Sequence, residues 1–226
     1  MKKAMSKIRI IPAILATTEK EYRDKLFRIE KSGQFADGWI QIDLMDNTFV
    51  QNKSVGPQIL AKYPTTLRKE AHLMVDFPQA PALKLVKLPV ERFIVPFEIK
   101  EDALNEFMSF VKVFSKAEIG FSLNPETAVD DVEGCWEDAD AILVMGVHPG
   151  FGGQKFILET VGKVKETARL REQNNLHFLI GVDGGINENN AKALADAGAD
   201  YLVIGEHLIN GKITENLEKI RQAIGN

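Results

Sequence analysis

Short apolar runs alternate with longer amphipathic stretches along the whole of this 226-residue chain. Several of the short runs are apolar on both faces, a pattern typical of strands buried in a parallel sheet that helices cover on its outer side. The predicted strands are Ile8–Ile14, Trp39–Leu44, Glu70–Val75, Arg92–Val95, Glu118–Leu123, Ala141–Val144, Phe178–Val182 and Tyr201–Ile204.

Helical periodicity fills most of the segments between these runs. In Glu19–Lys31, apolar residues such as Tyr22 and Leu26 recur at helical spacing among charged neighbours. Asn187 is the expected N-cap of a later helix, and Gly198 its C′ residue. The other predicted helices are Asp102–Ser115, Lys155–Asn174 and Asn187–Ala197, with weaker patterns between Val55–Lys62 and Pro81–Val86.

Eight strands that alternate with helices indicate an α/β fold. That number of repeats suits a closed (β/α)₈ TIM barrel, which typically has about 250 residues. An open doubly wound sheet is the structural alternative. No proline-rich or serine-rich linker divides the chain, so we expect one barrel domain spanning residues 1–226. In such a barrel the chemistry belongs to the carboxyl ends of the strands and the loops that follow them.

Composition narrows the classes of function. The net charge of −4 argues against nucleic acid or an anionic membrane as partner, because both require a concentrated basic surface. The single cysteine, Cys135, excludes an intramolecular disulfide. The basic start is followed only by the apolar run Ile8–Leu15, which Arg9 and Pro12 interrupt, so neither a signal peptide nor a membrane span is indicated. We expect a soluble cytoplasmic protein.

Two glycine-rich turns follow predicted strands and precede helical patterns. The first lies within Val147–Gln154, and the second is Gly184-Gly185. Backbone amides of such turns can converge on an anion without a Cβ in the way. Asp183 directly precedes the second turn, where a substrate held by its phosphate would present its reactive carbons. The pattern suggests chemistry on a small phosphorylated metabolite.

The chain resembles the ribulose-phosphate 3-epimerase family along essentially its whole length. The His-Pro-Gly-Phe-Gly-Gly-Gln and His-Leu-Met-Val segments are specific for this resemblance. The Ala-Gly-Ala-Asp turn is weaker support, because many phosphate-binding barrels share it. The matching segments are Ile11–Leu15, Ile42–Asp46, His72–Val75, Leu123–Thr127, Met145–Gln154, Val182–Gly185 and Ala197–Asp200.

Members of that family are (β/α)₈ isomerases that invert C3 of a phosphorylated ketose with the help of one divalent metal ion. The resemblance implies that Asp43 and Asp183 exchange protons with opposite faces of a planar enediolate and also bind the metal, with His72 as a third ligand. A Lewis-acidic metal stabilises the enediolate charge, and inversion requires one proton-transfer group on each face.

The resemblance also implies a substrate pocket, a sugar-phosphate ligand and a homo-oligomer. The expected apolar wall around the enediolate consists of Met45, Met74 and Met145. The residues expected at the phosphate end are Gly152, Gly153, Gly184, Gly185, Gly205 and Glu206. The implied reaction converts D-ribulose 5-phosphate into D-xylulose 5-phosphate.

The chain departs from the family pattern inside the same pocket. Gln41 replaces the first ligand histidine, Ala13 replaces a serine after the first strand, and Glu206 replaces the serine of the phosphate turn. The end of the fourth strand, Pro96-Phe97-Glu98, is changed as well. Gln41 can bind a metal through its carbonyl, but as a weaker and harder donor than imidazole, so among zinc, manganese, iron and magnesium it favours manganese or magnesium over zinc. We therefore expect a divergent member with weakened metal binding or a shifted substrate.

Several alternatives remain open from the sequence. His72 could be a satisfied core histidine, Gln41 a polar filler, and His148 either a substrate contact or a surface residue. The alternative functions are the same reaction on a hexulose phosphate such as allulose 6-phosphate, or non-catalytic binding of sugar phosphates. Phosphate-binding barrels of amino-acid biosynthesis share the glycine turns but do not need Asp43, His72 and Asp183 together.

Overall fold

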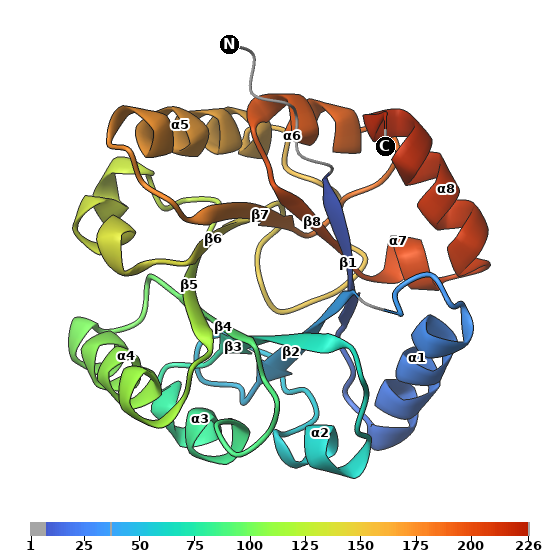
Figure 1. The fold of residues 1–226 in the computed structure, drawn as a ribbon, viewed down its shortest axis with the longest axis horizontal. Coiled ribbons are helices and arrows are strands. Elements are labelled where there is room, and N and C mark those ends of the chain that lie inside the picture. Colours follow the sequence, from blue (N-terminus) through green and yellow to red (C-terminus); the bar gives the residue numbers. More distant parts are fainter. Residues whose placement is uncertain (1–7, 37, 226) are drawn as a thin grey trace.

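The computed structural model describes residues 8–36 and 38–225, without the side chains of 133–135. The basic start of the chain and the Cys135 side chain thus lie outside the described residues. The predicted barrel is confirmed: eight parallel strands pair in chain order, and β8 closes on β1 (Figure 1). The strands are β1 (Arg9–Ile14), β2 (Trp39–Met45), β3 (Arg68–Met74), β4 (Arg92–Pro96), β5 (Glu118–Leu123), β6 (Ala141–Met145), β7 (Leu179–Asp183) and β8 (Tyr201–Ile204).

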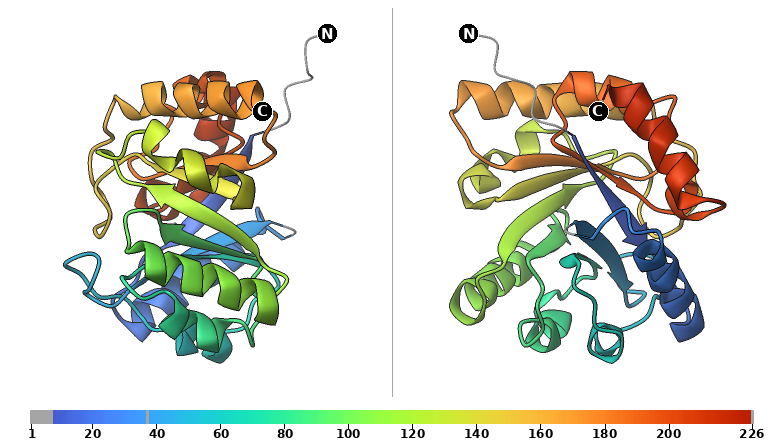
Figure 2. Two further views of the ribbon diagram at one scale, coloured as in Figure 1. Left: turned by 90° about the vertical axis from the view of Figure 1, so that its left-hand side faces the viewer. Right: turned by 45° about the vertical axis from the view of Figure 1, so that its right-hand side comes forward.

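Helices form an outer layer around the strands, as the three views together show (Figures 1 and 2). Apolar residues of both layers form one cluster between the barrel wall and these helices. The helices are α1 (Glu19–Lys31), α2 (Gln58–Lys62), α3 (Gln79–Leu85), α4 (Glu101–Phe114), a 3₁₀ helix (Asp130–Asp138), α5 (Thr160–Gln173), α6 (Ala191–Ala197), α7 (Glu206–Ile209) and α8 (Ile213–Ile224). Among the described residues, no helix has the length and apolar character needed to span a membrane.

Two helix starts differ from the prediction. The helix predicted from Lys155 begins only at Thr160, because the chain before it is tied into the loop after β6, where the Ile157 amide donates to the Gly146 carbonyl over 2.8 Å. Asn187 is not the N-cap of α6, which begins at Ala191.

The two asparagines before α6 interact in the opposite direction to the one expected of an N-cap at Asn187. The side-chain oxygen of Asn190 accepts a hydrogen bond from the backbone amide of Asn187 over 2.9 Å. This bond shapes the turn that leads into the helix. The expected end of α6 is confirmed: Gly198 adopts the left-handed conformation with φ of 110°.

Strand register aligns the polar residues inside the barrel. Asp43 on β2 is paired with His72 on β3, and Met145 on β6 with Asp183 on β7. Because alternate residues of a strand point to the same face, Gln41 projects inward two positions below Asp43. The carboxyl ends of β2, β3 and β7 thus bring three ionisable side chains to one end of the barrel.

The amino-terminal half of the barrel interior holds a second set of charges. The buried Arg92 guanidinium lies 2.7 Å from a Glu70 carboxylate oxygen and stacks over Trp39 with 4.6 Å between its carbon and the ring centre. The Tyr201 ring lies against the same guanidinium. The ring fits there because Gly181 has no side chain; a Cβ on Gly181 would lie 2.2 Å from the nearest atom of the Tyr201 ring. This half of the interior is closed by packing and ion pairing.

Candidate active site

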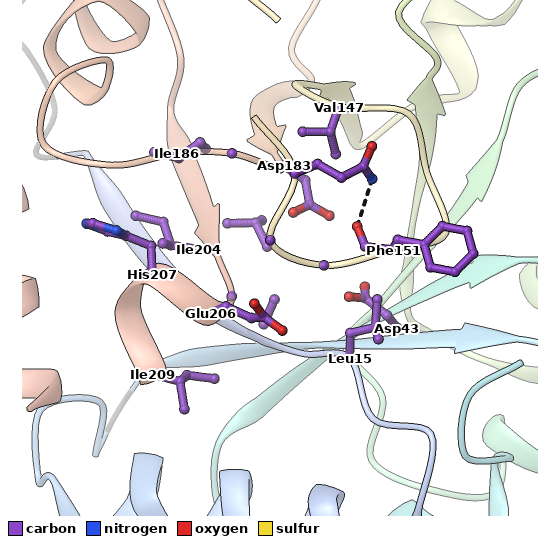
Figure 3. Close-up of a pocket in the computed structure, with 18 of the residues that line it drawn as sticks. Leu15, Asp43, Val147, Phe151, Asp183, Ile186, Ile204, Glu206, His207 and Ile209 are labelled. Atoms are coloured by element: carbon purple, nitrogen blue, oxygen red, sulfur yellow. Dashed lines mark hydrogen bonds between the residues drawn. The ribbon is translucent and has the colours of Figure 1, made fainter. Parts of the chain in front are cut away.

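A pocket of about 520 Å³ opens at the carboxyl ends of the strands (Figure 3). Its floor includes Asp43 and Asp183, and its rim is formed by the loops after β6, β7 and β8. Phe151 lies on the loop after β6, which crosses the mouth of the barrel. The volume suits a small metabolite, and the location is where barrels carry their chemistry.

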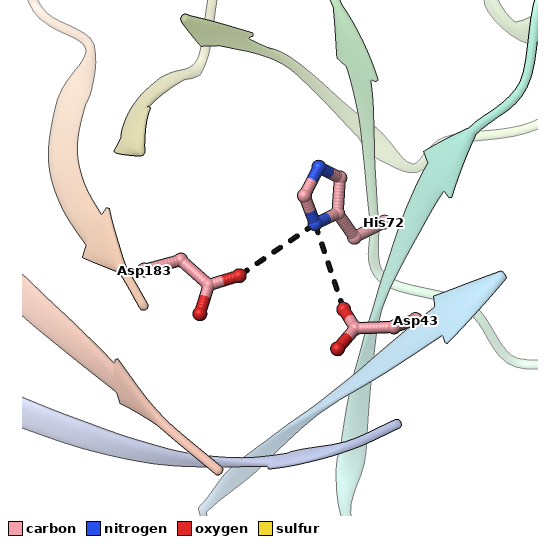
Figure 4. A group of neighbouring side chains, drawn as sticks. All are labelled: Asp43, His72 and Asp183. Atoms are coloured by element: carbon pink, nitrogen blue, oxygen red, sulfur yellow. Dashed lines mark ion pairs between the residues drawn. The ribbon is translucent and has the colours of Figure 1, made fainter. Parts of the chain in front are cut away.

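Asp43, His72 and Asp183 form a compact cluster at the floor. Their potential ligand atoms lie within 4.8 Å of one another. His72 Nδ1 is 3.5 Å from Asp43 Oδ1 and 3.7 Å from Asp183 Oδ2, and it faces both carboxylates at once (Figure 4). The structure thus brings together three residues that are far apart in the sequence.

Gln41 completes this cluster from below. Its amide nitrogen donates to Asp43 Oδ1 over 2.8 Å and to Asp183 Oδ2 over 2.7 Å, the same two oxygens that His72 faces. Its amide oxygen is buried and has no hydrogen-bond partner among the described residues. In this orientation Gln41 holds the two carboxylates together, whereas a ligand role requires the amide to turn so that the oxygen faces the cluster.

Burial and proximity shift the pKa values of the cluster. Burial lowers the pKa of His72, but the adjacent Asp183 and Asp43 raise it by more, to a net value of about 9. Burial raises the pKa of Asp43, an effect that His72 partly offsets. Without a metal, a protonated His72 is therefore the main positive charge that balances the two carboxylates.

Ser122 on β5 orients His72, a role that the sequence analysis did not predict. Its hydroxyl oxygen lies 3.2 Å from His72 Nε2, and both groups are buried. This contact fixes the ring so that Nδ1 points at the carboxylates, as outer partners of ligand histidines do. Within the part of the chain that the structure describes, Nδ1 itself has no hydrogen-bond partner. A serine in an apolar strand carries no signal of such a role.

The three buried donors fit a divalent cation. Two carboxylates and one imidazole nitrogen are ligands common to zinc, manganese, iron and magnesium sites. The unpartnered Nδ1 of His72 and the unpartnered amide oxygen of Gln41 are two buried polar atoms that a cation could satisfy, the second only after the amide turns.

The two glycine turns line one side of the pocket. Gly184 and Gly185 adopt φ values of 102° and 67°, and a Cβ on Gly185 would come within 2.7 Å of the Phe156 backbone. In the described part of the chain, the backbone amides of Gly152, Gly153, Gly184 and Gly185 donate to no backbone carbonyl. These amides remain available to an anionic group in the pocket.

Side-chain amides fasten the loop after β6 over the pocket. Asn52 donates to the Gly150 carbonyl over 2.6 Å, and Gln154 donates to the carbonyls of His148 and Phe151 over 2.7 and 2.8 Å. His148 itself is exposed and lies 3.0 Å from Glu126, so it is a surface residue of this loop and does not line the pocket.

The methionines divide between two positions. Met74 and Met145 line the pocket, as expected, and both are buried. Met45 is buried too, but it packs with Met74 and Val50 behind the pocket wall. It supports the wall and does not itself line the pocket.

The remaining departures from the family pattern have separate structural consequences. Ala13 and Gly205 lie side by side in the pocket, where a Cβ on Gly205 would be 3.9 Å from the Ala13 Cβ. Glu98 lies away from the pocket and accepts hydrogen bonds from the Asn124 amide, over 2.7 Å, and from the Thr127 hydroxyl. Its role is therefore to hold the loop after β5.

Comparison with known proteins gives one consistent result. The family model described as "Ribulose-phosphate 3 epimerase family" matches residues 9–209. The ribulose-phosphate 3-epimerase of Bacillus subtilis (strain 168) is 36% identical over 201 residues, which cover 88% of this chain and 90% of that protein. The ribulose-phosphate 3-epimerase of Chlamydia muridarum is 34% identical over 215 residues, which cover 93% and 92%.

Solved structures with the same architecture are more distant in sequence. A 3-hexulose-6-phosphate synthase superposes with a TM-score of 0.64 at 14% identity, over 97% of this chain and all of that one. An orotidine 5'-monophosphate decarboxylase from Sulfolobus solfataricus superposes with a TM-score of 0.63 at 15% identity, over 97% and 98%. At such identities these likenesses establish the fold alone.

Proposed function

Because this chain belongs to the ribulose-phosphate 3-epimerase family, we propose that it inverts C3 of a ketose phosphate, converting D-ribulose 5-phosphate into D-xylulose 5-phosphate. It is an isomerase of the epimerase class. The observation that carries the proposal is the pair Asp43 and Asp183, which come from two non-adjacent strands and line one pocket beside a shared histidine.

The two carboxylates carry out the proton transfer in this proposal. One aspartate removes the C3 proton from one face of the substrate, and the other delivers a proton to the opposite face. Burial, which raises the pKa of Asp43, makes that carboxylate a better base than an exposed aspartate. Without a metal, Gln41 Nε2 holds both carboxylates in place by donating a hydrogen bond to each.

The proposed metal ligands are Asp43, His72 and Asp183, with Gln41 as a fourth through its reversed amide. When bound, a divalent cation supplies Lewis-acid stabilisation of the negative charge that develops on the substrate oxygens. Met74 and Met145 exclude water from the same region without competing as ligands.

The proposed phosphate end of the pocket is lined by the glycine turns. The free amides of Gly152, Gly153, Gly184 and Gly185 would donate to the phosphate oxygens, and Gly205 leaves the space open next to Ala13. The exposed Glu206 side chain borders this end and has to turn away from the glycines when a phosphate binds.

Proton NMR of D-ribulose 5-phosphate in D₂O tests the function, with manganese, zinc, iron or magnesium added in turn. We expect loss of the C3 proton signal together with the appearance of D-xylulose 5-phosphate. Absence of exchange with every metal would contradict the proposal, and the same assay on allulose 6-phosphate would detect a hexulose phosphate epimerase.

The orientation of Gln41 favours one second candidate, a non-catalytic sugar-phosphate binding protein. Its amide nitrogen already bridges the two carboxylates, which lowers their need for a cation. Metal analysis separates the two: stoichiometric metal favours the enzyme, and a metal-free protein that binds ribulose 5-phosphate favours the binder. The Gln41→His variant should bind manganese or zinc more tightly in a titration; unchanged affinity would show that residue 41 is not a ligand.

A further inference from the structure

Glu206 occupies the part of the pocket where the first glycine turn offers its amides. A Cβ on Gly152 would lie 3.1 Å from Glu206 Oε1, and a Cβ on Gly153 would lie 2.9 Å from Glu206 Oε2. The carboxylate thus packs directly against both glycines across the pocket. Figure 3 shows it directed toward the middle of the pocket, which Asp43 and Asp183 also line.

The charges that line the pocket are mostly negative. Three carboxylates, those of Asp43, Asp183 and Glu206, belong to the lining. Lys25 is the one lysine or arginine in the described lining, and its ammonium group is engaged with the Leu15 carbonyl over 2.6 Å and with Glu21 over 2.7 Å. A phosphate dianion therefore meets a carboxylate at the turn that should receive it, without a free cation to offset the repulsion.

A carboxylate in this position is better suited to a substrate whose distal end carries hydroxyl groups in place of a phosphate. Carboxylate oxygens accept hydrogen bonds and offer up to four lone-pair sites, so Glu206 can bind two hydroxyl groups of a sugar. The Glu206 side chain is exposed, and it has no hydrogen-bond partner in the described part of the chain that would hold it away from a ligand.

We infer that this chain also epimerises ketoses that lack a phosphate, with Glu206 binding their distal hydroxyl groups. The inference rests on the proposed function, because the same two aspartates carry out the reaction. One C3–H bond breaks on one face as its proton passes to one aspartate, and one C3–H bond forms on the other face with a proton from the second. No oxidant, reductant or co-substrate is consumed.

Steady-state kinetics on D-ribulose and D-ribulose 5-phosphate test the inference. A site built to bind phosphate would favour the phosphorylated sugar by about 10⁴- to 10⁵-fold in kcat/KM, whereas we expect a preference below about 100-fold for this chain. In Glu206→Gln and Glu206→Ser, kcat/KM should rise for the phosphorylated sugar and fall for the free one. The preference for phosphate should then grow by at least about tenfold.

Glu126→Gln is the matched control. Glu126 lies 3.0 Å from His148 on the loop after β6, and neither residue lines the pocket, so its neutralisation removes a negative charge without changing the phosphate end. It should leave the ratio of the two kcat/KM values as it is. A titration with inorganic phosphate provides a second readout, in which Glu206→Gln should bind at least about tenfold more tightly than the unmodified protein.

The possible outcomes separate a failure of the inference from a failure of the proposed function. Turnover of ribulose 5-phosphate with a preference above about 10⁴-fold, unchanged in both Glu206 variants, would overturn the inference and leave the proposed function standing. Lack of proton exchange on both sugars in every variant would overturn the proposed function and the inference with it. Tighter phosphate binding by Glu206→Gln together with a shifted substrate ratio supports the inference.

Discussion

The two ends of the barrel interior both bury charged side chains, and they balance the charge differently. At the amino-terminal end, Glu70 is paired with Arg92 over 2.7 Å, and the guanidinium is stacked on Trp39 and Tyr201. At the carboxyl end, two aspartates share only a histidine at 3.5 and 3.7 Å and the side-chain amide of Gln41.

This difference separates a structural charge network from a chemical one. A permanent cation in close contact, Arg92, fixes the Glu70 carboxylate and partly offsets the rise in its pKa that burial causes. Burial raises the pKa of Asp43 as well, and its partner there is a group that itself titrates. The carboxyl end is thus able to gain and lose protons or bind a cation, while the amino-terminal end only supports the wall.

The largest expected effect is loss of catalysis at the carboxyl end. Asp183→Asn keeps the shape of the side chain but removes one of the two proposed proton-transfer groups, so kcat for C3 exchange should fall by about 10²- to 10⁴-fold. Urea unfolding should show unchanged or higher stability, because a charge beside Asp43 is removed. A variant that retains most of its exchange activity would exclude Asp183 as a catalytic residue.

The next effect is on stability at the amino-terminal end. Arg92→Met leaves Glu70 buried without its cation, and the free energy of unfolding should fall by about 3–5 kcal/mol in urea denaturation. The double variant Glu70→Leu with Arg92→Met removes both charges and should recover much of this loss. Equal instability of the two variants would indicate that the stability is lost because Arg92 no longer packs on Trp39, and not because the Glu70 charge is unpaired.

A smaller effect concerns how the free energy of unfolding of the metal-free protein depends on pH. The pKa of His72 is raised from its ordinary 6.5 to about 9 in the folded state, so its contribution to stability is fully present below pH 6.5. It is lost as pH rises toward 9, and the loss amounts to about 3 kcal/mol at most. Urea unfolding in the presence of a chelator should show this decline, and His72→Gln should flatten it. A decline that persists in the variant would assign the effect to other groups.

The smallest effect should come from Tyr201. Its hydroxyl oxygen lies 3.3 Å from a Glu70 carboxylate oxygen, so Tyr201→Phe removes one hydrogen bond and keeps the ring stacked on Arg92. We expect a loss of about 1 kcal/mol in thermal or urea unfolding and unchanged C3 exchange. Loss of activity in this variant would show that the two ends are coupled.

Much of the architecture was accessible from the sequence. Strands such as Ile8–Ile14 and Tyr201–Ile204 were placed within one residue of their observed bounds, because a strand buried on both faces leaves a short apolar run. Helix starts were less accurate. Lys155 continues a helical pattern, but the chain there is bonded to Gly146 in the preceding loop, and no local pattern reveals such a contact.

The sequence by itself determined the eightfold alternation of strands and helices and the residue types at the strand ends, because periodicity and turn composition are local properties. Only the tertiary structure decided that the Gln41 amide donates to Asp43 and Asp183, that Ser122 orients His72, and that Glu206 lies against Gly152 and Gly153. These contacts join elements as far as 142 positions apart along the chain. They form only when the barrel closes and brings the carboxyl ends of its strands around one pocket.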